Sequence, residues 1–121
     1  MKTITMMALA AIAATPALAQ QHSMQGMDHS KMNMNDPNNP FMPAEMTMHD
    51  KMMSAKGANA AETWTRKMIE HHRGAIAMAQ IVLRQSPDAR TRTKAQQTIT
   101  SQTKEVADLQ ASLRAMGKRA Q

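Results

Sequence analysis

The strongest hydrophobic pattern in the chain runs from Trp64 to Leu83. At about 100° per residue, the apolar side chains of this segment gather on one side of a helix together with His71 and His72. The apolar set is Trp64, Met68, Ala75, Met78, Ala79, Val82 and Leu83, and the opposite polar set is Arg66, Lys67, Glu70, Arg73 and Gln80. We therefore predict a helix from residues 60–62 to Gln85 that turns both imidazoles and the Trp64 ring towards the core.

A second long helix is predicted after the breaker Ser86-Pro87-Asp88, from about Asp88 to Met116, with Gly117 as its stop signal. Its inward stripe consists of Ala95, Ile99, Gln102, Val106, Leu109, Leu113 and Met116. The short turn makes the two long helices an antiparallel hairpin. The segment from Pro43 to Lys56, which ends before Gly57, predicts a third helix packed across the hairpin. The expected fold class is all-α, a small helical bundle.

The helix predicted for Pro43 to Lys56 is rich in methionine. Met42, Met46, His49 and Met53 fall on one stripe, and Met48 and Met52 form a second pair. His49 lies three or four residues from Met46, Met52 and Met53, which is close enough for one helix to hold one ion. Core packing by the same methionines is an equally open interpretation.

The first 19 residues resemble a secretory signal. Lys2 precedes a short apolar block, and Ala17-Leu18-Ala19 is a small-x-small cleavage pattern. We expect a periplasmic or secreted protein cut near Ala19, with no stable membrane anchor, because the block is too short to span a bilayer. Residues 20–40 are polar, Met- and His-bearing and predicted to be disordered, which leaves residues 41–121 as the helical metal-binding domain. The tract HSMQGMDHSKMNM is typical of soft-metal tails, although a plain linker is the alternative.

Composition favours thioether chemistry over thiol chemistry. The 121 residues include 15 methionines, no cysteine, one tryptophan and one phenylalanine, so the conventional core is thin and no disulfide or thiolate ligand is available. Methionine and histidine without convergent carboxylates favour Cu(I) or Ag(I), with Cu(II) as a further alternative.

The two adjacent histidines are expected to face different neighbours. Met68 lies three residues before His71 and four before His72, so its sulfur can accompany either imidazole. Neighbouring residues diverge by about 100° on a helix, so the two rings are not expected to close on one ion. We expect His71 to follow the line of Trp64 and Met78, and His72 to face the helix that carries His49 and Met52.

The segment MIEHHRGAIAMA, Met68 to Ala79, resembles the MIPHHxxAIxMA signature of the secreted bacterial family known as domain of unknown function 305, which includes CopM-like periplasmic copper-binding proteins. MHDKM at Met48 to Met52 is similar to the family's MHxxM. QTKEV at Gln102 to Val106 is similar to its QxxEI. The likeness covers nearly all of residues 41–121. Glu70 replaces the family's proline, and Leu109 stands where methionine is frequent.

This resemblance implies a ferritin-like helical bundle that binds copper or silver through methionine and histidine. Carried over by position, the implied ligands are Met48, His49, Met52, Met68, His71, His72 and Met78. Met46 and Met53 join them as candidates by their spacing from His49. Gln102 and Glu105 match the family pattern and are expected to have a structural role.

Two other functional classes compete with copper binding. A di-metal oxidase needs several carboxylates with Glu-x-x-His pairs, and no glutamate in this chain has a histidine three residues later, so we expect no enzyme activity. The net charge of +6 leaves a metal-independent structural or polyanion-binding hairpin as the alternative. Export argues against nucleic acid as a partner. Copper ions, another periplasmic copper protein and a second copy of the chain are the expected partners.

Overall fold

Three α-helices form the part of the chain that the computed structural model describes, which is residues 33, 34 and 36–121. They are α1 (Met42–Ser54), α2 (Ala60–Gln85) and α3 (Ala89–Ala115). These ranges contain no strand, and the all-α prediction is confirmed. The predicted signal peptide and most of the segment 20–40 lie outside the described residues. No helix in the described ranges is both long and apolar enough for a bilayer crossing.

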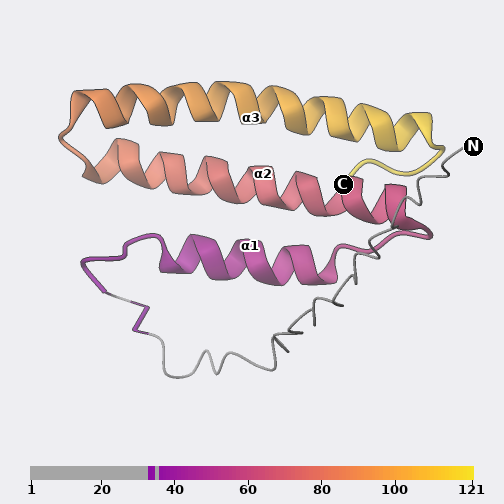
Figure 1. The fold of residues 1–121 in the computed structure, drawn as a ribbon, viewed down its shortest axis with the longest axis horizontal. Helices are drawn as coiled ribbons and strands as arrows, with labels where there is room; N and C mark the ends of the chain where they lie inside the picture. The colour runs from indigo at the N-terminus through magenta and orange to yellow at the C-terminus, as the bar shows by residue number, and fades with distance from the viewer. Residues whose placement is uncertain (1–32, 35) are drawn as a thin grey trace, which may run out of the picture. The chain divides into compact units, whose positions relative to one another are not determined.

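The three helices lie side by side in one layer with α2 in the middle (Figure 1). α2 and α3 form the predicted antiparallel hairpin, and α1 runs antiparallel to α2 along its other edge. Within the described residues α1 contacts α2 and has no packing contact with α3. The Met-rich helix therefore packs against one helix of the hairpin, not across both. As a result, α2 has neighbours on two opposite sides and two further sides without a helix.

The ends of the helices follow from local signals. The Asn59 side chain caps α2 by accepting from the Glu62 N–H at 3.0 Å, and Asp88 caps α3 by accepting from the Thr91 N–H at 2.6 Å. Gly117 has a positive φ of 71°, a left-handed conformation that suits glycine and stops α3. These ends agree with the sequence to within one or two residues. α1 ends at Ser54, slightly before the predicted Lys56.

The hydrophobic core is thin, as the composition predicted. Ile69 of α2 and Leu113 of α3 are the largest fully buried side chains among the described residues. No residue of α1 is fully buried. The prediction that Trp64 belongs to the core is wrong, because its side chain is 59% exposed. The Trp64 ring lies beside residues of α3 but is not covered by them.

Glu70 is also placed differently from the prediction. The sequence pattern assigned it to the solvent side, yet it is only 5% exposed. Its Oε1 accepts from Arg73 at 2.8 Å and from the Gln121 side chain, which returns to α2 from the C-terminal residues. Arg73 also donates to the Gln121 carbonyl at 2.9 Å. A long-range polar contact therefore covers a carboxylate that periodicity alone leaves in water.

Glu62 joins the start of α2 to the C-terminal residues. One carboxylate oxygen accepts from the Ala58 N–H at 2.9 Å and lies 3.4 Å from Lys118 Nζ, and the other accepts from Arg66 at 2.9 Å. The Ala58 hydrogen bond and then the Arg66 contact lower the pKa of Glu62 from 4.5 to about 2. The ionised carboxylate therefore stabilises the folded chain.

We expect Glu62 to make folding sensitive to acid. Because the folded pKa lies below the unfolded one, its stabilisation is complete above about pH 4.5 and disappears as the pH falls towards 2. Melting temperatures measured by circular dichroism from pH 6 to pH 2 should fall more steeply for the natural chain than for Glu62→Gln. Glu45→Gln, a change at an exposed position of α1, is the control and should keep the natural slope. Equal slopes for all three proteins would contradict this role.

Candidate metal site

A buried histidine paired with a glutamate marks the interface of α2 and α3. His72 is 8% exposed, and its Nε2 lies 2.7 Å from Oε2 of Glu105. The distance is that of a short hydrogen bond from the ring N–H to the carboxylate. Glu105 approaches from α3 with about half of its side chain, 51%, exposed. The pair therefore joins a buried imidazole to a carboxylate that reaches water.

The second nitrogen of His72 is the unusual atom of this pair. Nδ1 is buried and has no hydrogen-bond partner among the described residues. When Nε2 carries the proton that Glu105 accepts, Nδ1 of a neutral ring keeps its lone pair. Buried polar atoms are nearly always satisfied, so an unpaired imidazole nitrogen calls for an explanation. A metal ion is one partner that such a lone pair accepts.

The His72 ring lines a groove between α2 and α3, which we call the acidic groove after the carboxylates on its α3 border. Its volume is about 260 Å³. The lining residues are Trp64, Met68 and His72 from α2 and Glu105, Asp108, Leu109 and Ser112 from α3. The groove thus brings a thioether, an imidazole and an indole ring together, as the spacing of Met68 and His72 predicted.

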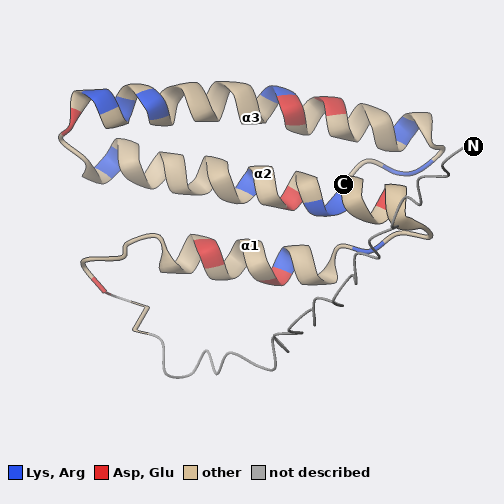
Figure 2. Ribbon diagram, viewed as in Figure 1, with Lys and Arg blue, Asp and Glu red and all other residues tan. Residues whose placement is uncertain are grey.

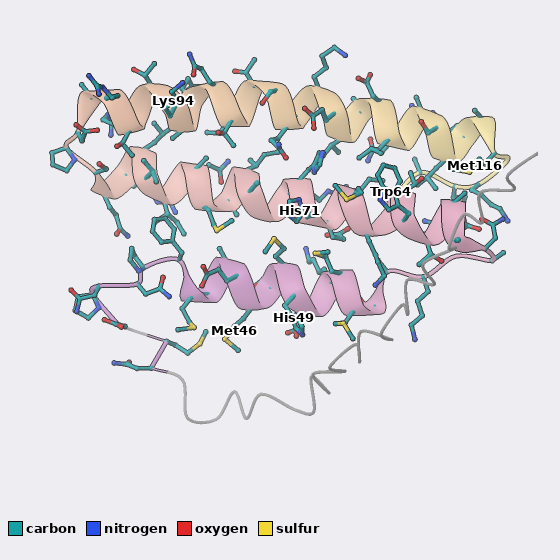
Figure 3. The ribbon with its side chains drawn as sticks, in the orientation of Figure 1. Met46, His49, Trp64, His71, Lys94 and Met116 are labelled. Carbon is teal, nitrogen blue, oxygen red and sulfur yellow. The ribbon has the colours of Figure 1, made fainter. Side chains whose placement is uncertain are left out.

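His71 points away from this groove, contrary to the prediction that both rings face inward. Its side chain is exposed, and the two histidine rings lie 5.8 Å apart between centroids at an interplanar angle of 61°. The divergence expected of neighbouring helical residues is confirmed. Only His72 reaches the side of α2 that α3 covers, because one residue of helical rotation separates the two. His71 follows the line of Trp64, which lies open (Figure 3).

The prediction that His72 faces the Met-rich helix is wrong. α1 packs on the opposite side of α2, where the Met48 side chain lies against Gly74. A Cβ at Gly74 would stand 2.3 Å from the Met48 sulfur and 2.7 Å from the Met48 Cβ. The missing side chain of Gly74 therefore allows the close approach of α1 and fixes its side of α2.

The predicted ligands on α1 divide into two groups. Met48 and Met52 are half-buried towards α2, and the Met52 carbonyl accepts a hydrogen bond from Lys67 Nζ. Met46 and His49 project from the side of α1 away from α2 (Figure 3). Met53 is 60% exposed. The structure therefore gives no common site for the α1 methionines and His72.

Met78 lies in a second groove on the same side of α2, which we call the apolar groove. Its volume is about 410 Å³. The lining residues are Phe41 and Glu45 near α1, Ala75, Met78, Ala79 and Val82 from α2, and Thr91, Lys94, Ala95 and Thr98 from α3. Of the nine predicted ligands, Met68 and His72 share the acidic groove.

Glu105 was expected to have a structural role, and its contact with His72 is compatible with that role. The sequence did not predict its partner. Its position along the helix already indicated that it lies near the packed side of α3, because Glu105 follows the half-buried Gln102 by three residues and precedes Leu109 by four. It therefore lies at the border of the inward stripe. Gln102 also has a buried oxygen without a partner in the described part of the chain.

The donor set of the acidic groove suits a soft monovalent ion. Residues 33, 34 and 36–121 contain no cluster of three or more histidine, aspartate and glutamate side chains placed to hold a metal. Met68 and His72 are a different kind of donor pair, a thioether and an imidazole, which Cu(I) accepts. Trp64 forms part of the same wall, and its ring can shield an ion there from water.

Comparison with known proteins identifies the family of this chain. A family model described as "Domain of unknown function (DUF305)" matches residues 3–113, which is most of the chain. No curated protein matches at a significant level. Because the match includes all of α1 and α2 and nearly all of α3, the chain belongs to the DUF305 family.

Proposed function

We propose that this protein is an exported copper-binding protein that sequesters or carries Cu(I) in copper homeostasis or resistance, with Ag(I) as a chemically similar cargo. The observation that carries the proposal is the buried Nδ1 of His72, which has no partner among the described residues and belongs to a ring that lines the same groove as Met68. A soft ion bound to both would satisfy this atom.

Glu105 supports the proposal through the geometry of the imidazole. Metal-binding histidines commonly donate the other ring N–H to a carboxylate, which fixes the tautomer and raises the basicity of the ligand nitrogen. The 2.7 Å contact between His72 Nε2 and Glu105 has this form. The carboxylate also supplies a negative charge beside a site whose two proposed ligands are neutral. It therefore offsets the charge of a monovalent cation.

The methionines of α1 give the protein a second, looser set of soft donors. Met46, His49 and Met53 lie on one stripe of α1, and Met53 is largely exposed. An exposed thioether can take up an ion without opening the fold. We propose that these residues collect copper weakly and that the acidic groove retains it, a division that suits a carrier or buffer.

The proposal is tested by anaerobic Cu(I) competition titration of the chain beginning at Gln20, beside a truncation that begins at Phe41 and keeps all three helices. We expect tight binding that survives the truncation. Methionine oxidation with peroxide should weaken it, since a sulfoxide is no longer a soft ligand. A peptide of residues 20–40 is the control for Met-rich sequence without the helices.

Two outcomes would overturn the proposal. One is a helical domain that binds Cu(I) no more tightly than the peptide control. The other is full affinity after complete methionine oxidation. Salt-sensitive binding to anionic lipid without any effect of metal would favour the polyanion-binding alternative, in which His72 and Glu105 serve only to join α2 to α3.

A further inference from the structure

One side of the helical layer is apolar, and no described helix lies over it. α1 and α3 lie at opposite edges of α2, so a third stripe of α2 runs along this side between them. The stripe runs along the whole helix and consists of Trp64, Met68, His71, Ala75, Met78 and Val82. The acidic groove opens beside its first half and the apolar groove beside its second half. We call this side of the layer the open face.

The open face is self-complementary. Position 73 is the common centre of three residue pairs, which are Trp64 with Val82, Met68 with Met78, and His71 with Ala75. A two-fold axis through this centre would lay each residue of one antiparallel α2 over its pair in the other. The exposed Trp64 ring then meets Val82 and the apolar groove, a large side chain over a hollow. His71 likewise meets a small residue.

Two charged residues of α3, Lys94 and Asp108, are also arranged symmetrically about this centre. The turn between α2 and α3 is centred on position 87, which is 14 residues from both position 73 and position 101, so the antiparallel hairpin brings these two positions roughly level. Lys94 and Asp108 are each seven residues from position 101. Lys94 borders the apolar groove, whereas Asp108 and Glu105 border the acidic groove. Basic residues gather near the hairpin turn, and the acidic residues of α3 lie towards its other end (Figure 2). An antiparallel pair of layers therefore brings Lys94 of each copy towards Asp108 of the other.

Two nearby charged residues, Lys104 and Glu45, also contribute to this charge pattern. Asp108 already pairs with Lys104 at 2.7 Å, an exposed contact of small strength, and Glu45 lies on the α1 border of the apolar groove. Neither reverses the pattern, because the α3 border of the acidic groove carries two carboxylates and that of the apolar groove carries one ammonium and no carboxylate.

The open face is large enough for a stable contact. α2 has 26 residues and α3 has 27, and a helix of 26 residues is about 39 Å long. Helices pack about 9 Å apart, so a strip two helix spacings wide covers roughly 700 Å². Stable complexes bury about 800 Å² on each partner. A second copy of the chain therefore matches the open face in area, shape and charge.

We propose that two copies of this protein associate through their open faces, with the two α2 helices antiparallel and the Trp64 ring of each copy in the apolar groove of the other. The association needs no metal. It covers the Trp64 ring, which the described part of the chain leaves exposed, together with the half-buried residues of the stripe, and it places His71 of both copies near the two-fold axis.

The test uses the mature chain from Gln20 with a metal chelator present, so that copper binding has no part in the result. Sedimentation equilibrium over a range of concentrations gives the mass, and the fluorescence of Trp64, the only tryptophan, reports its burial. We expect a two-chain mass with an emission maximum that moves to shorter wavelength as the concentration rises. Trp64→Ala should raise the dissociation constant about 30-fold or more, as for an aromatic side chain anchored in a pocket.

A charge exchange identifies the orientation. Lys94→Asp and Asp108→Lys should each weaken the dimer, and the double variant should recover the natural affinity, because both charges change sign together. Gln80→Ala, at an exposed position of α2 on its polar side, is the control and should leave the dimer unchanged.

Three results would overturn the proposal. The first is the mass of one chain at every concentration, and the second is a dimer in which Trp64 keeps the emission of an exposed ring. The third is a short-wavelength emission that does not depend on concentration, which would mean that another segment of the same chain covers the face.

Discussion

Replacing His72 with alanine should lower the Cu(I) affinity of the mature chain by more than 100-fold, whereas His71→Ala should lower it by less than about tenfold. The physical reason is the different burial of the two rings. His72 lines the acidic groove with Met68 and holds its Nε2 on Glu105, while His71 is exposed. Removing a carboxylate behind a ligand costs about 10- to 100-fold in metal affinity, and removing the ligand itself should cost more.

Glu105→Gln separates a ligand role for His72 from a purely structural one. The amide keeps the size of the side chain, but it has no negative charge and only one accepting oxygen. We therefore expect Cu(I) affinity to fall about 10- to 100-fold. Circular dichroism must show that the variants keep their helices. Asp108→Asn, a neighbouring change in the same groove, is the matched control and should have a smaller effect.

Equal, small losses for His72→Ala and His71→Ala would refute the assignment of the acidic groove as the binding site. A larger loss for His71→Ala would move the site to the open face, where His71 lies on the same stripe as Met68 and Met78. The anaerobic competition titration distinguishes these results because each variant is measured against the same Cu(I) chelator.

The sequence was sufficient to predict the helices and their ends. Ser86-Pro87-Asp88 marked the hairpin turn and Gly117 the stop of α3, and both signals act locally through backbone geometry and capping. Most of the side chains through which α3 packs on α2 were also predicted. Ala95 and Leu113 are buried and Val106 and Leu109 are half-buried, whereas Met116 at the end of the predicted stripe is exposed.

The sequence could not decide which sides of α2 are covered. Periodicity found one apolar stripe and placed Trp64 and His71 in the core, but α1 and α3 pack on the two sides next to that stripe. Ile69 and Gly74 define the covered sides, and their direction depends on where the other helices lie. A helical wheel contains no information about neighbours, so the apolar stripe was correctly found, but Trp64 and His71 were wrongly predicted to be buried.

Long-range pairs explain the other differences. Glu70 is buried because Gln121, far along the chain, reaches its carboxylate. The pairing of His72 with Glu105 likewise depends on the hairpin bringing α3 beside α2. The spacing of Met68 and His72 did predict a shared groove, since residues four apart lie on the same side of one helix. Contacts within one helix were therefore predictable, and contacts between helices were not.

Gly74→Val should destabilise the chain by about 2 kcal/mol and release α1 from α2. The new side chain would enter the space of the Met48 sulfur, Cγ and Cβ, all of which lie within 2.7 Å of a Cβ built at Gly74. A flexible thioether can turn aside, but the Met48 Cβ moves only with the helix, so α1 must shift. Overpacking of this kind costs about 1–3 kcal/mol. Chemical denaturation monitored by circular dichroism measures the loss.

Two further variants identify the cause of the destabilisation by Gly74→Val. Ala107→Val, at an exposed position of α3, should cost at most about 0.7 kcal/mol through helix propensity alone. Met48→Ala removes the opposing side chain, so adding it to Gly74→Val should restore part of the lost stability, and the double-mutant cycle measures the contact directly. A destabilisation of Gly74→Val no larger than that of the control would show that α1 does not need this close approach.

The same variant tests where copper is held. α1 has 13 residues and none that is fully buried, so once displaced from α2 it should lose its helical structure, which short isolated helices rarely keep. His72, Met68 and Glu105 lie on the other two helices and should remain in place. Cu(I) affinity should therefore survive in Gly74→Val while helical signal is lost. A parallel loss of both would mean that Met48 or Met52 completes the binding site from α1.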